Sequence, residues 1–335
     1  MSQLGLKEAM HWEKAEGGRV HCLLCPHGCR IAESDVGLCR VRQNVDGSLR
    51  SLNYNRVSAV HWDPVEKKPL FHFHPGADIL SLGTVGCNLA CAFCQNWTIS
   101  QSACGTRRMT SEEAVELAKS RPDNLGISYT YNEPFIWYEF VLETARMIHE
   151  AGMKNVLVTN GYVNEGPLRE LLPYVDAMNV DVKSMGKEFY RELCRARPEP
   201  PRRTVEIAYE AGCLVEVTNL VIPNWNDRED EIAALVDWLA GVGRDIPLHF
   251  SRYHPDHQLA EPPTPTETLT RAREIAVKKL DYVYIGNVWD LDGENTLCPH
   301  CRKTVVVRQG FQVSRIAVKN GRCELCGGQV KMVGA

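Results

Sequence analysis

The sequence predicts an α/β fold: a partial (β/α)6 barrel of the TIM type, with a small cysteine-rich module at each end. The first observation is that short apolar runs alternate with amphipathic stretches between residues 78 and 293, which is the pattern of parallel strands joined by helices. The second is that these apolar runs are nearly continuous, as expected of strands covered on both faces. The third is that all but three of the 14 cysteines form three tight groups, placed before, at the start of and after this region.

Seven apolar runs are the strand candidates, which suits a partial or complete barrel. They lie at 78–85, 126–130, 155–160, 177–182, 214–222, 247–253 and 281–286. The first helix is expected to have Ser111 as its cap, and the second to begin at Pro134, a favoured first helical position, and to end at Gly152. Four more helices are expected at about 164–172, 201–211, 227–241 and 266–280.

Composition divides the chain into three parts. Residues 1–77 form a four-cysteine module with a proline-rich lead-in, residues 78–293 the barrel, and residues 294–335 a small β-module with paired cysteines. A length of 335 residues with 44% hydrophobic and 24% charged residues suits one barrel-sized domain with such appendages.

Charge and hydropathy exclude several classes of function. A net charge of −4 argues against a nucleic-acid-coating surface. No apolar run reaches the length of a membrane span, and the start of the chain lacks the basic and apolar regions of an export signal. We therefore expect a cytoplasmic protein, where clustered cysteines usually hold metals or do redox chemistry rather than form disulfides.

The central cysteines are the strongest chemical signal. Cys87, Cys91 and Cys94 follow the first barrel strand with the spacing CxxxCxxC. Three thiolates this close can hold an iron–sulfur cluster, which normally takes four, and would leave one iron open to a small molecule. The loop lies at the carboxyl end of a strand, where barrels of this type place active sites. A zinc site is the alternative, although zinc sites usually use CxxC pairs and complete a fourth ligand.

This motif, with Phe93 before its last cysteine, resembles the signature of the radical S-adenosylmethionine (radical SAM) superfamily. The resemblance implies a [4Fe-4S] cluster whose open iron binds S-adenosylmethionine. One electron then cleaves this cofactor to methionine and a 5′-deoxyadenosyl radical, which abstracts a hydrogen atom.

Further motifs extend the resemblance along the barrel. TYNEP (130–134) takes the place of a GGEP-type motif, with Tyr131 and Asn132 replacing two glycines and Glu133 retained; VTNGY (158–162), VDVKS (180–184) and LVIPNWND (220–227) resemble segments of glycyl-radical-enzyme activases. The cofactor-binding candidates are Phe93, Asn132, Glu133, Thr159, Asn160, Asp181, Lys183, Asn219 and His254. The motifs assign no side chain to the hydrogen-abstraction step, so the catalytic residues are unknown.

The position of these polar residues is a partly independent argument. Most lie near the carboxyl ends of the expected strands, where side chains converge on one barrel mouth. Carboxylates suit an ammonium group, whereas Lys and Asn suit a carboxylate or a ribose. The alternative is that Asp181 and Lys183, two apart on a strand, form a structural pair on one face.

The whole chain is most similar to the radical SAM enzyme of the AmmeMemoRadiSam system, through its CxLCPxxC start, TYNEP, FSRYHPD, YIGNV and its CPxC tail. The similarity implies a protein or peptide substrate, an electron donor such as flavodoxin or ferredoxin, and Memo-like and AMME-type partner proteins. A glycyl-radical-enzyme activase is one alternative function. A non-catalytic metal-bearing binding protein is another, which the polar strand ends argue against.

The outer cysteines predict two further metal sites. Cys298, Cys301, Cys323 and Cys326 form two CxxC pairs, the pattern of a zinc ribbon with a structural zinc. Cys22, Cys25, Cys29 and Cys39 could hold zinc or an auxiliary iron–sulfur cluster, and the spacing leaves both open. The three scattered cysteines, Cys104, Cys194 and Cys213, are expected to be small buried hydrophobic residues.

Overall fold

The computed structural model describes residues 6–288 and 292–335, and its centre is a single eight-stranded sheet. The strand order is β16–β15–β14–β13–β12–β11–β9–β8. The strands are β8 (Ala59–Pro64), β9 (Asp78–Gly83), β11 (Asn124–Tyr129), β12 (Lys154–Thr159), β13 (Ala177–Asp181), β14 (Leu214–Val221), β15 (Leu248–Arg252) and β16 (Val283–Gly286). Seven are parallel and β8 pairs antiparallel with β9. No pairing joins β8 to β16 among the described residues, so the barrel is partial.

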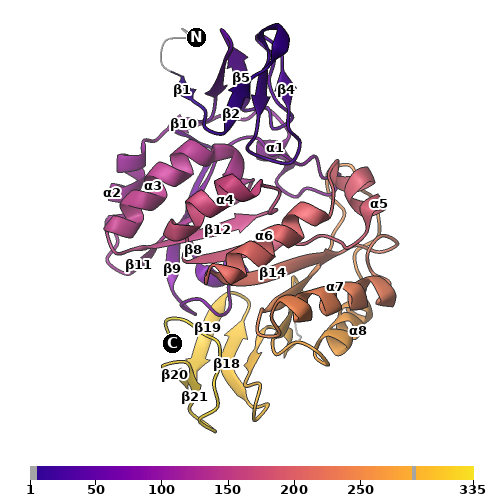
Figure 1. Ribbon diagram of the computed structural model, residues 1–335. Coiled ribbons are helices and arrows are strands. Elements are labelled where there is room, and N and C mark those ends of the chain that lie inside the picture. Colours follow the sequence, from indigo (N-terminus) through magenta and orange to yellow (C-terminus); the bar gives the residue numbers. More distant parts are fainter. Residues whose placement is uncertain (1–5, 289–291) are drawn as a thin grey trace.

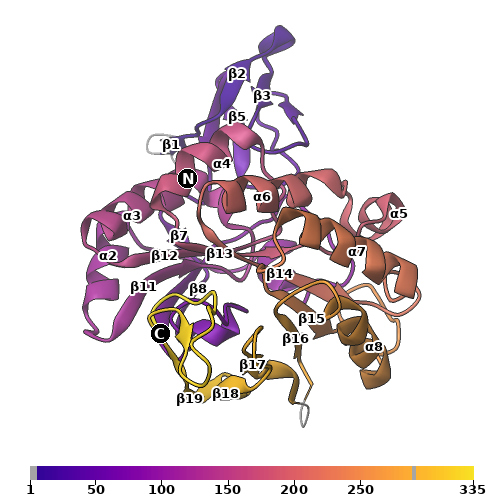
Figure 2. The same cartoon turned by 60° about the horizontal axis from the view of Figure 1, so that its bottom comes forward.

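Helices cover the outside of this sheet, as Figure 2 shows in a view along the strands. They are α2 (Ser111–Lys119), α3 (Tyr138–Glu150), α4 (Glu165–Leu171), α6 (Glu199–Glu210), α7 (Glu229–Val242) and α8 (Thr266–Ala276). Short helical segments are η1 (Glu16–Gly18), η2 (Val65–Lys67), α1 (Trp97–Ser100), η3 (Pro134–Trp137), η4 (Leu172–Tyr174), α5 (Lys187–Phe189), η5 (Tyr190–Cys194) and η6 (Asp292–Glu294). The predicted parallel α/β fold is therefore confirmed, with one parallel strand more than a (β/α)6 barrel.

Two predicted helix starts were wrong by a few residues. The cap of α2 is Thr110 and not Ser111: the Thr110 hydroxyl accepts from the Glu113 amide, and the Glu113 carboxylate accepts from the Thr110 amide. This reciprocal pair satisfies two amides that the helix itself cannot bond. Pro134 opens the tight turn η3, and the α-helical part of the segment begins at Tyr138.

The N-terminal module contains two small antiparallel sheets that the sequence analysis did not foresee. One is β1 (Lys7–Glu8), β6 (Ser48–Ser51) and β5 (Arg42–Val45); the other is β2 (Trp12–Lys14), β3 (Val20–Cys22) and β4 (Arg30–Ile31). Nearby, β7 (Arg56–Val57) pairs with β10 (Arg107–Arg108). In Figure 1 the module lies at the end of the barrel that also carries α1. A buried ion pair between Arg42 and Glu139 joins the module to α3.

The C-terminal module lies at the opposite end of the molecule (Figure 1). It consists of β17 (Thr296–Leu297), β18 (Thr304–Gln309) and β19 (Gln312–Ile316), followed by the hairpin of β20 (Val318–Lys319) and β21 (Arg322–Cys323). Its apolar core includes Phe71, Tyr282 and Tyr284 from the barrel region. The Arg308 guanidinium donates to the Phe71 carbonyl at 2.6 Å, so the module is built onto the barrel and shares its core.

No helix in the described part of the chain is both long enough and apolar enough to span a bilayer. The expectation of no export signal rests on the first residues of the chain, of which 1–5 lie outside the described residues.

Candidate functional site

The loop after β9 carries Cys87, Cys91 and Cys94 and is held on both sides by hydrogen bonds. Gly86 N donates to the Ile99 carbonyl at 2.9 Å, and the Gln101 side chain donates to the Cys91 carbonyl at 2.9 Å. The thiols have polar partners of their own: Leu89 N donates to Cys87 Sγ at 3.4 Å, and the Ser100 hydroxyl lies 3.2 Å from Cys94 Sγ. These bonds hold the three cysteines in place within the loop.

The donor set of this loop fits an iron–sulfur cluster. In the described chain, Cys87, Cys91 and Cys94 are not gathered into a compact group that could hold a single metal ion. The corners of a cluster need wider spacing, because each thiolate binds a different iron. The surrounding side chains, which include Leu89, Phe93 and Tyr190, are buried and apolar. Such a shell limits the access of solvent to a cluster.

Asn132 attaches the second parallel strand to the start of this loop. Its side-chain oxygen accepts from Thr84 N at 3.1 Å, and its side-chain nitrogen donates to the Gly86 carbonyl at 2.8 Å. Asn132 therefore positions the cysteine loop through these two bonds.

Tyr131 adopts the backbone conformation that favours glycine, with a φ of 72°. Its hydroxyl donates to Asp63 at 2.5 Å and its ring lies 4.7 Å from the Lys68 ammonium. These contacts from β8 and the turn after it offset the strain of a side chain at this position.

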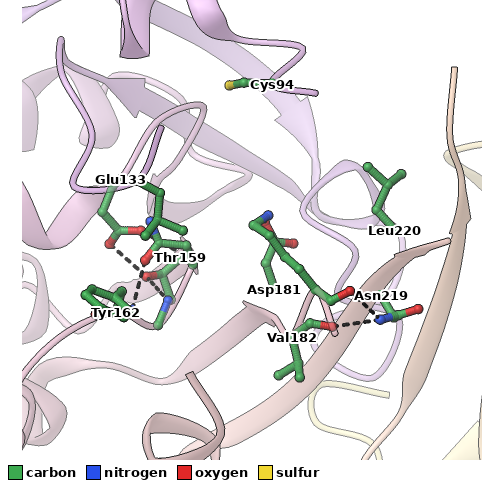
Figure 3. Close-up of polar contacts among 12 residues, drawn as sticks. Cys94, Glu133, Thr159, Tyr162, Asp181, Val182, Asn219 and Leu220 are labelled. Atoms are coloured by element: carbon green, nitrogen blue, oxygen red, sulfur yellow. Dashed lines mark hydrogen bonds and ion pairs between the residues drawn. The ribbon is translucent and has the colours of Figure 1, made fainter. Parts of the chain in front are cut away.

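Glu133 is a buried carboxylate surrounded by donors. Its oxygens accept from Phe135 N at 2.9 Å, the Thr159 hydroxyl at 2.7 Å and Asn160 N at 2.8 Å (Figure 3). Burial raises the pKa of Glu133 to about 7, although these three hydrogen bonds favour the charged form. Glu133 thus holds the turn after β12 in place. A cation bound beside it would lower its pKa and favour the charged carboxylate.

Asn160 connects this carboxylate to the cysteine loop. Its side-chain nitrogen donates to the Asn88 side chain at 2.9 Å and to Cys87 Sγ at 3.6 Å. The ends of β11 and β12 and the cysteine loop therefore form one hydrogen-bonded unit.

Asp181 and Lys183, at the end of β13, lie on the other side of the mouth and form an ion pair of 2.9 Å. Burial alone would lower the pKa of Lys183, but Asp181 and the Cys91 sulfur raise it well above its usual value. The ammonium lies 5.7 Å from the centre of the Phe93 ring, which packs against Phe189. Asp181 is partly exposed, so one acceptor of the mouth is accessible to a ligand.

The last two candidates differ in their surroundings. The Asn219 side chain donates to the carbonyls of Val182 and Lys183, and its buried oxygen has no partner in the described structure. That unpaired acceptor is available to a ligand. His254 is exposed after β15 and makes no hydrogen bond with the described residues, so its contact with the cofactor stays a prediction.

Comparisons with known proteins agree with this geometry. The family description "Radical SAM superfamily" matches residues 81–236. An uncharacterized protein of Methanocaldococcus jannaschii is 45% identical over 336 residues, covering 98% of this chain and 100% of that protein. The chain belongs to the radical SAM superfamily. It is an enzyme of that superfamily.

More distant relatives of this radical SAM enzyme include the pyruvate formate-lyase 1-activating enzyme of Escherichia coli strain K12, which is 27% identical over 179 residues, covering 50% of this chain and 71% of that one. Among solved structures, Streptococcus suis SuiB bound to S-adenosylmethionine has a TM-score of 0.51 and 15% identity, covering 67% of this chain and 53% of SuiB. This structural likeness shows a common fold.

The sequence analysis missed two residues of the radical SAM site. Cys194, taken as a small buried hydrophobic residue, is fully buried but packs in the same cluster as Cys91, and its carbonyl accepts from Ala90 N. Asn88 forms hydrogen bonds to the Asn160 side chain and the Tyr162 carbonyl. The position of Asn88 next to Cys87 could have indicated that it belongs to the site. Cys194 lies in a distant segment, and no local pattern connects it to the cysteine loop.

The structure brings the C-terminal cysteines together. The sulfurs of Cys298, Cys301, Cys323 and Cys326 all lie within 4.8 Å of one another. Two of the separations are 3.7 and 3.9 Å. Four thiolates bound tetrahedrally to zinc at about 2.3 Å stand about 3.8 Å apart, so this set fits a zinc ion. The four N-terminal cysteines line a single pocket but are not gathered in this compact way.

Proposed function

We propose that this radical SAM enzyme binds a [4Fe-4S] cluster through Cys87, Cys91 and Cys94 and uses S-adenosylmethionine to abstract hydrogen from a protein or peptide substrate. When bound, the cluster supplies the electron that cleaves S-adenosylmethionine to methionine and a 5′-deoxyadenosyl radical. The observation that carries the proposal is the bonded unit of the cysteine loop with Glu133 and Asn160, which places polar acceptors beside three free thiols.

The residues at the barrel mouth have different roles in cofactor binding. Asp181 offers an accessible carboxylate to the methionine ammonium group, and Lys183 offers a cation to its carboxylate. Asn219 offers its unpaired oxygen to a hydroxyl or an amine. Glu133, Thr159, Asn160 and Asn132 position the loop and the strand ends, because their polar atoms are already bonded to the protein.

The names of the relatives support a macromolecular substrate. The Escherichia coli relative is named for activating pyruvate formate-lyase, and a Clostridium scatologenes relative, 22% identical over 220 residues, is named for activating 4-hydroxyphenylacetate decarboxylase. Both are named for an action on another enzyme. The second candidate function, activation of a glycyl radical enzyme, rests on this similarity, which covers 50% of this chain for the Escherichia coli enzyme. The two cysteine-rich outer modules favour a different partner.

The remaining parts of the proposal concern partners and metals. We propose a low-potential electron donor such as flavodoxin or ferredoxin, partner proteins of the Memo-like and AMME types, and a cytoplasmic location. The compact C-terminal thiols support a structural zinc.

The test is an anaerobic assay of the full chain reconstituted with iron and sulfide. With reductant and S-adenosylmethionine, the protein should release 5′-deoxyadenosine, and the variant with Cys87, Cys91 and Cys94 all replaced by Ala should release none. A matched variant, Cys104→Ser, changes a thiol outside every group and should keep full activity. Cleavage by the triple variant would refute the assignment. Mass spectrometry of candidate partners after incubation then identifies the substrate.

A further inference from the structure

The four N-terminal cysteines surround one small pocket at the interface between their module and the barrel. Cys22 ends β3, Cys25 and Cys29 lie in the turn that follows, and Cys39 lies before β5. All four line the pocket together with Ile136 and Asn88 of the barrel. Three of them, Cys22, Cys25 and Cys39, are no more than 8% exposed. Four thiols around an enclosed apolar pocket form a ligand set.

The spacing of these thiols differs from that of the C-terminal set in the same chain. Any three thiols that share one zinc ion stand about 3.8 Å apart, and the C-terminal cysteines meet that requirement. The N-terminal cysteines, all of which are within the described residues, do not form such a compact group. In this respect they resemble Cys87, Cys91 and Cys94. Thiols that bind separate irons of one cluster must stand apart in this way.

A buried cation faces the same pocket with an unused donor. Arg42 lines the pocket and is 1% exposed. Its guanidinium donates to Glu139 and to the Met10 carbonyl, but its Nε has no partner in the described structure. A buried N–H group without an acceptor is costly unless a ligand satisfies it. A cluster with four thiolate ligands is anionic, and its sulfurs accept such hydrogen bonds.

The pocket adjoins the central cysteine loop. Asn88, which follows Cys87, forms part of its wall, and the His27 ring lies 2.7 Å from the Asn88 carbonyl. Gly86 approaches so closely that a Cβ atom there would lie 2.5 Å from the Cys39 carbonyl. Cys25 packs in the same cluster of side chains as the three central cysteines. The two cysteine sites are therefore built against each other.

We infer that Cys22, Cys25, Cys29 and Cys39 hold a second iron–sulfur cluster, with four thiolate ligands and a hydrogen bond from Arg42, rather than a zinc ion. This inference goes beyond the proposed function and does not depend on S-adenosylmethionine cleavage. Its closed ligand set leaves no iron open to a substrate. Its place beside Asn88 makes it a redox centre next to the central cysteines.

The experiment measures metal and sulfide in the full chain, prepared anaerobically with iron, sulfide and zinc all present. The unsubstituted protein should hold about eight irons, eight acid-labile sulfides and one zinc, since each of two clusters holds about four irons. The variant lacking Cys87, Cys91 and Cys94 should keep about four irons and the electron paramagnetic resonance signal of a four-thiolate cluster. Further replacement, Cys25→Ser with Cys39→Ser, should remove that iron and leave the zinc.

Two controls keep the test decisive. Arg42→Gln should retain the iron but shift the reduction potential of the cluster in the central triple variant. If the Cys25 and Cys39 replacements prevent folding, the metal content of the unsubstituted protein still distinguishes a second cluster from a second zinc ion. About four irons with two zincs per chain would overturn the inference, whether or not 5′-deoxyadenosine is formed.

Discussion

The Asn160 side chain donates a hydrogen bond to the Cys87 sulfur at 3.6 Å, while the backbone N–H of the same residue donates to the Glu133 carboxylate at 2.8 Å. One residue at the end of β12 thus touches both a cluster ligand and the buried carboxylate of the TYNEP motif. Asn160 therefore connects Glu133 to the cysteine loop through two hydrogen bonds.

Replacing Asn160 by Ala should lower the reduction potential of the central cluster. The N–H···S bond stabilises the more negative, reduced state, so its loss makes reduction harder. A potentiometric titration followed by electron paramagnetic resonance measures the shift. Asn287→Ala is the matched control, because its side chain donates to the Ser251 hydroxyl and not to a cysteine sulfur. An unchanged potential in the Asn160 variant would show that this contact does not reach the cluster.

Asp181→Asn and Glu133→Gln should weaken the enzyme in different ways. Asp181 is accessible and, among the described residues, is bonded only to Lys183, so its neutralisation should cost about 1–3 kcal/mol of cofactor binding and little stability. Glu133 accepts three protein hydrogen bonds, and in Glu133→Gln one carboxylate oxygen becomes an amide NH2 that faces a donor. This variant should therefore lose about 1–3 kcal/mol in the free energy of unfolding, in addition to binding the cofactor more weakly.

Calorimetric titration with S-adenosylmethionine and urea unfolding separate these two effects. Asp230→Asn, in an exposed pair with Arg228, should change neither. Equal affinity of the Asp181 variant and the parent protein would move the ammonium site elsewhere in the mouth.

The sequence was sufficient for the parallel strands of the barrel because most of their residues are buried and apolar. The strand at 155–160, for example, is seen at Lys154–Thr159, and the run at 214–222 at Leu214–Val221. The edge strand β8 was missed because it contains Pro64 and has exposed positions, so it lacks a buried run. Thr110 was missed as a cap, although Glu113, three residues later, was the signal for it.

For the site, the sequence motifs identified the polar residues at the strand ends but did not predict their hydrogen-bond partners. The sequence suggested Glu133 as a direct cofactor ligand, whereas its oxygens are bonded to Phe135, Thr159 and Asn160. The contact of Cys194 with the cysteine loop joins segments about 100 residues apart and leaves no local pattern. The sequence showed that Tyr131 replaces a glycine. The hydrogen bond from the Tyr131 hydroxyl to Asp63, which offsets the backbone strain, depends on β8, and that strand was not predicted.

Replacing Cys301 and Cys326 by Ser should reduce bound zinc by about one ion per chain. These two thiols are the more accessible of the four, and a structural zinc site does not survive with half of its ligands. The module should become less protected from hydrogen exchange while the barrel stays folded, since most of the barrel's apolar side chains pack in a separate core. Zinc content by mass spectrometry and exchange over residues 296–330 measure both effects, with Cys104→Ser as control. Iron in place of zinc in the parent protein would contradict the assignment.

Acidification should loosen the junction between the barrel and the C-terminal module through His72. The ring is fully buried: Nδ1 contacts the Lys331 carbonyl and Nε2 lies 2.6 Å from the Tyr284 hydroxyl. The carbonyl can only accept, so the neutral ring donates from Nδ1 and accepts at Nε2. Burial lowers the pKa of His72 to about 4, although the nearby Glu216 carboxylate opposes the shift.

The sign of the effect follows from where the proton binds. Between pH 6.5 and about 4 the unfolded chain binds a proton at His72 that the folded chain does not, so the free energy of unfolding falls as the pH falls. At pH 5.5 this single group should account for about 1.4 kcal/mol relative to pH 7.5. Urea unfolding at the two pH values should therefore show a steeper loss in the parent protein than in His72→Gln. His254→Gln, which changes an exposed ring, should keep the parent's pH dependence. Since metal loss and other titrations affect all three proteins alike, equal losses in the parent and the His72 variant would show that this histidine is protonated as readily in the folded protein as in the unfolded chain.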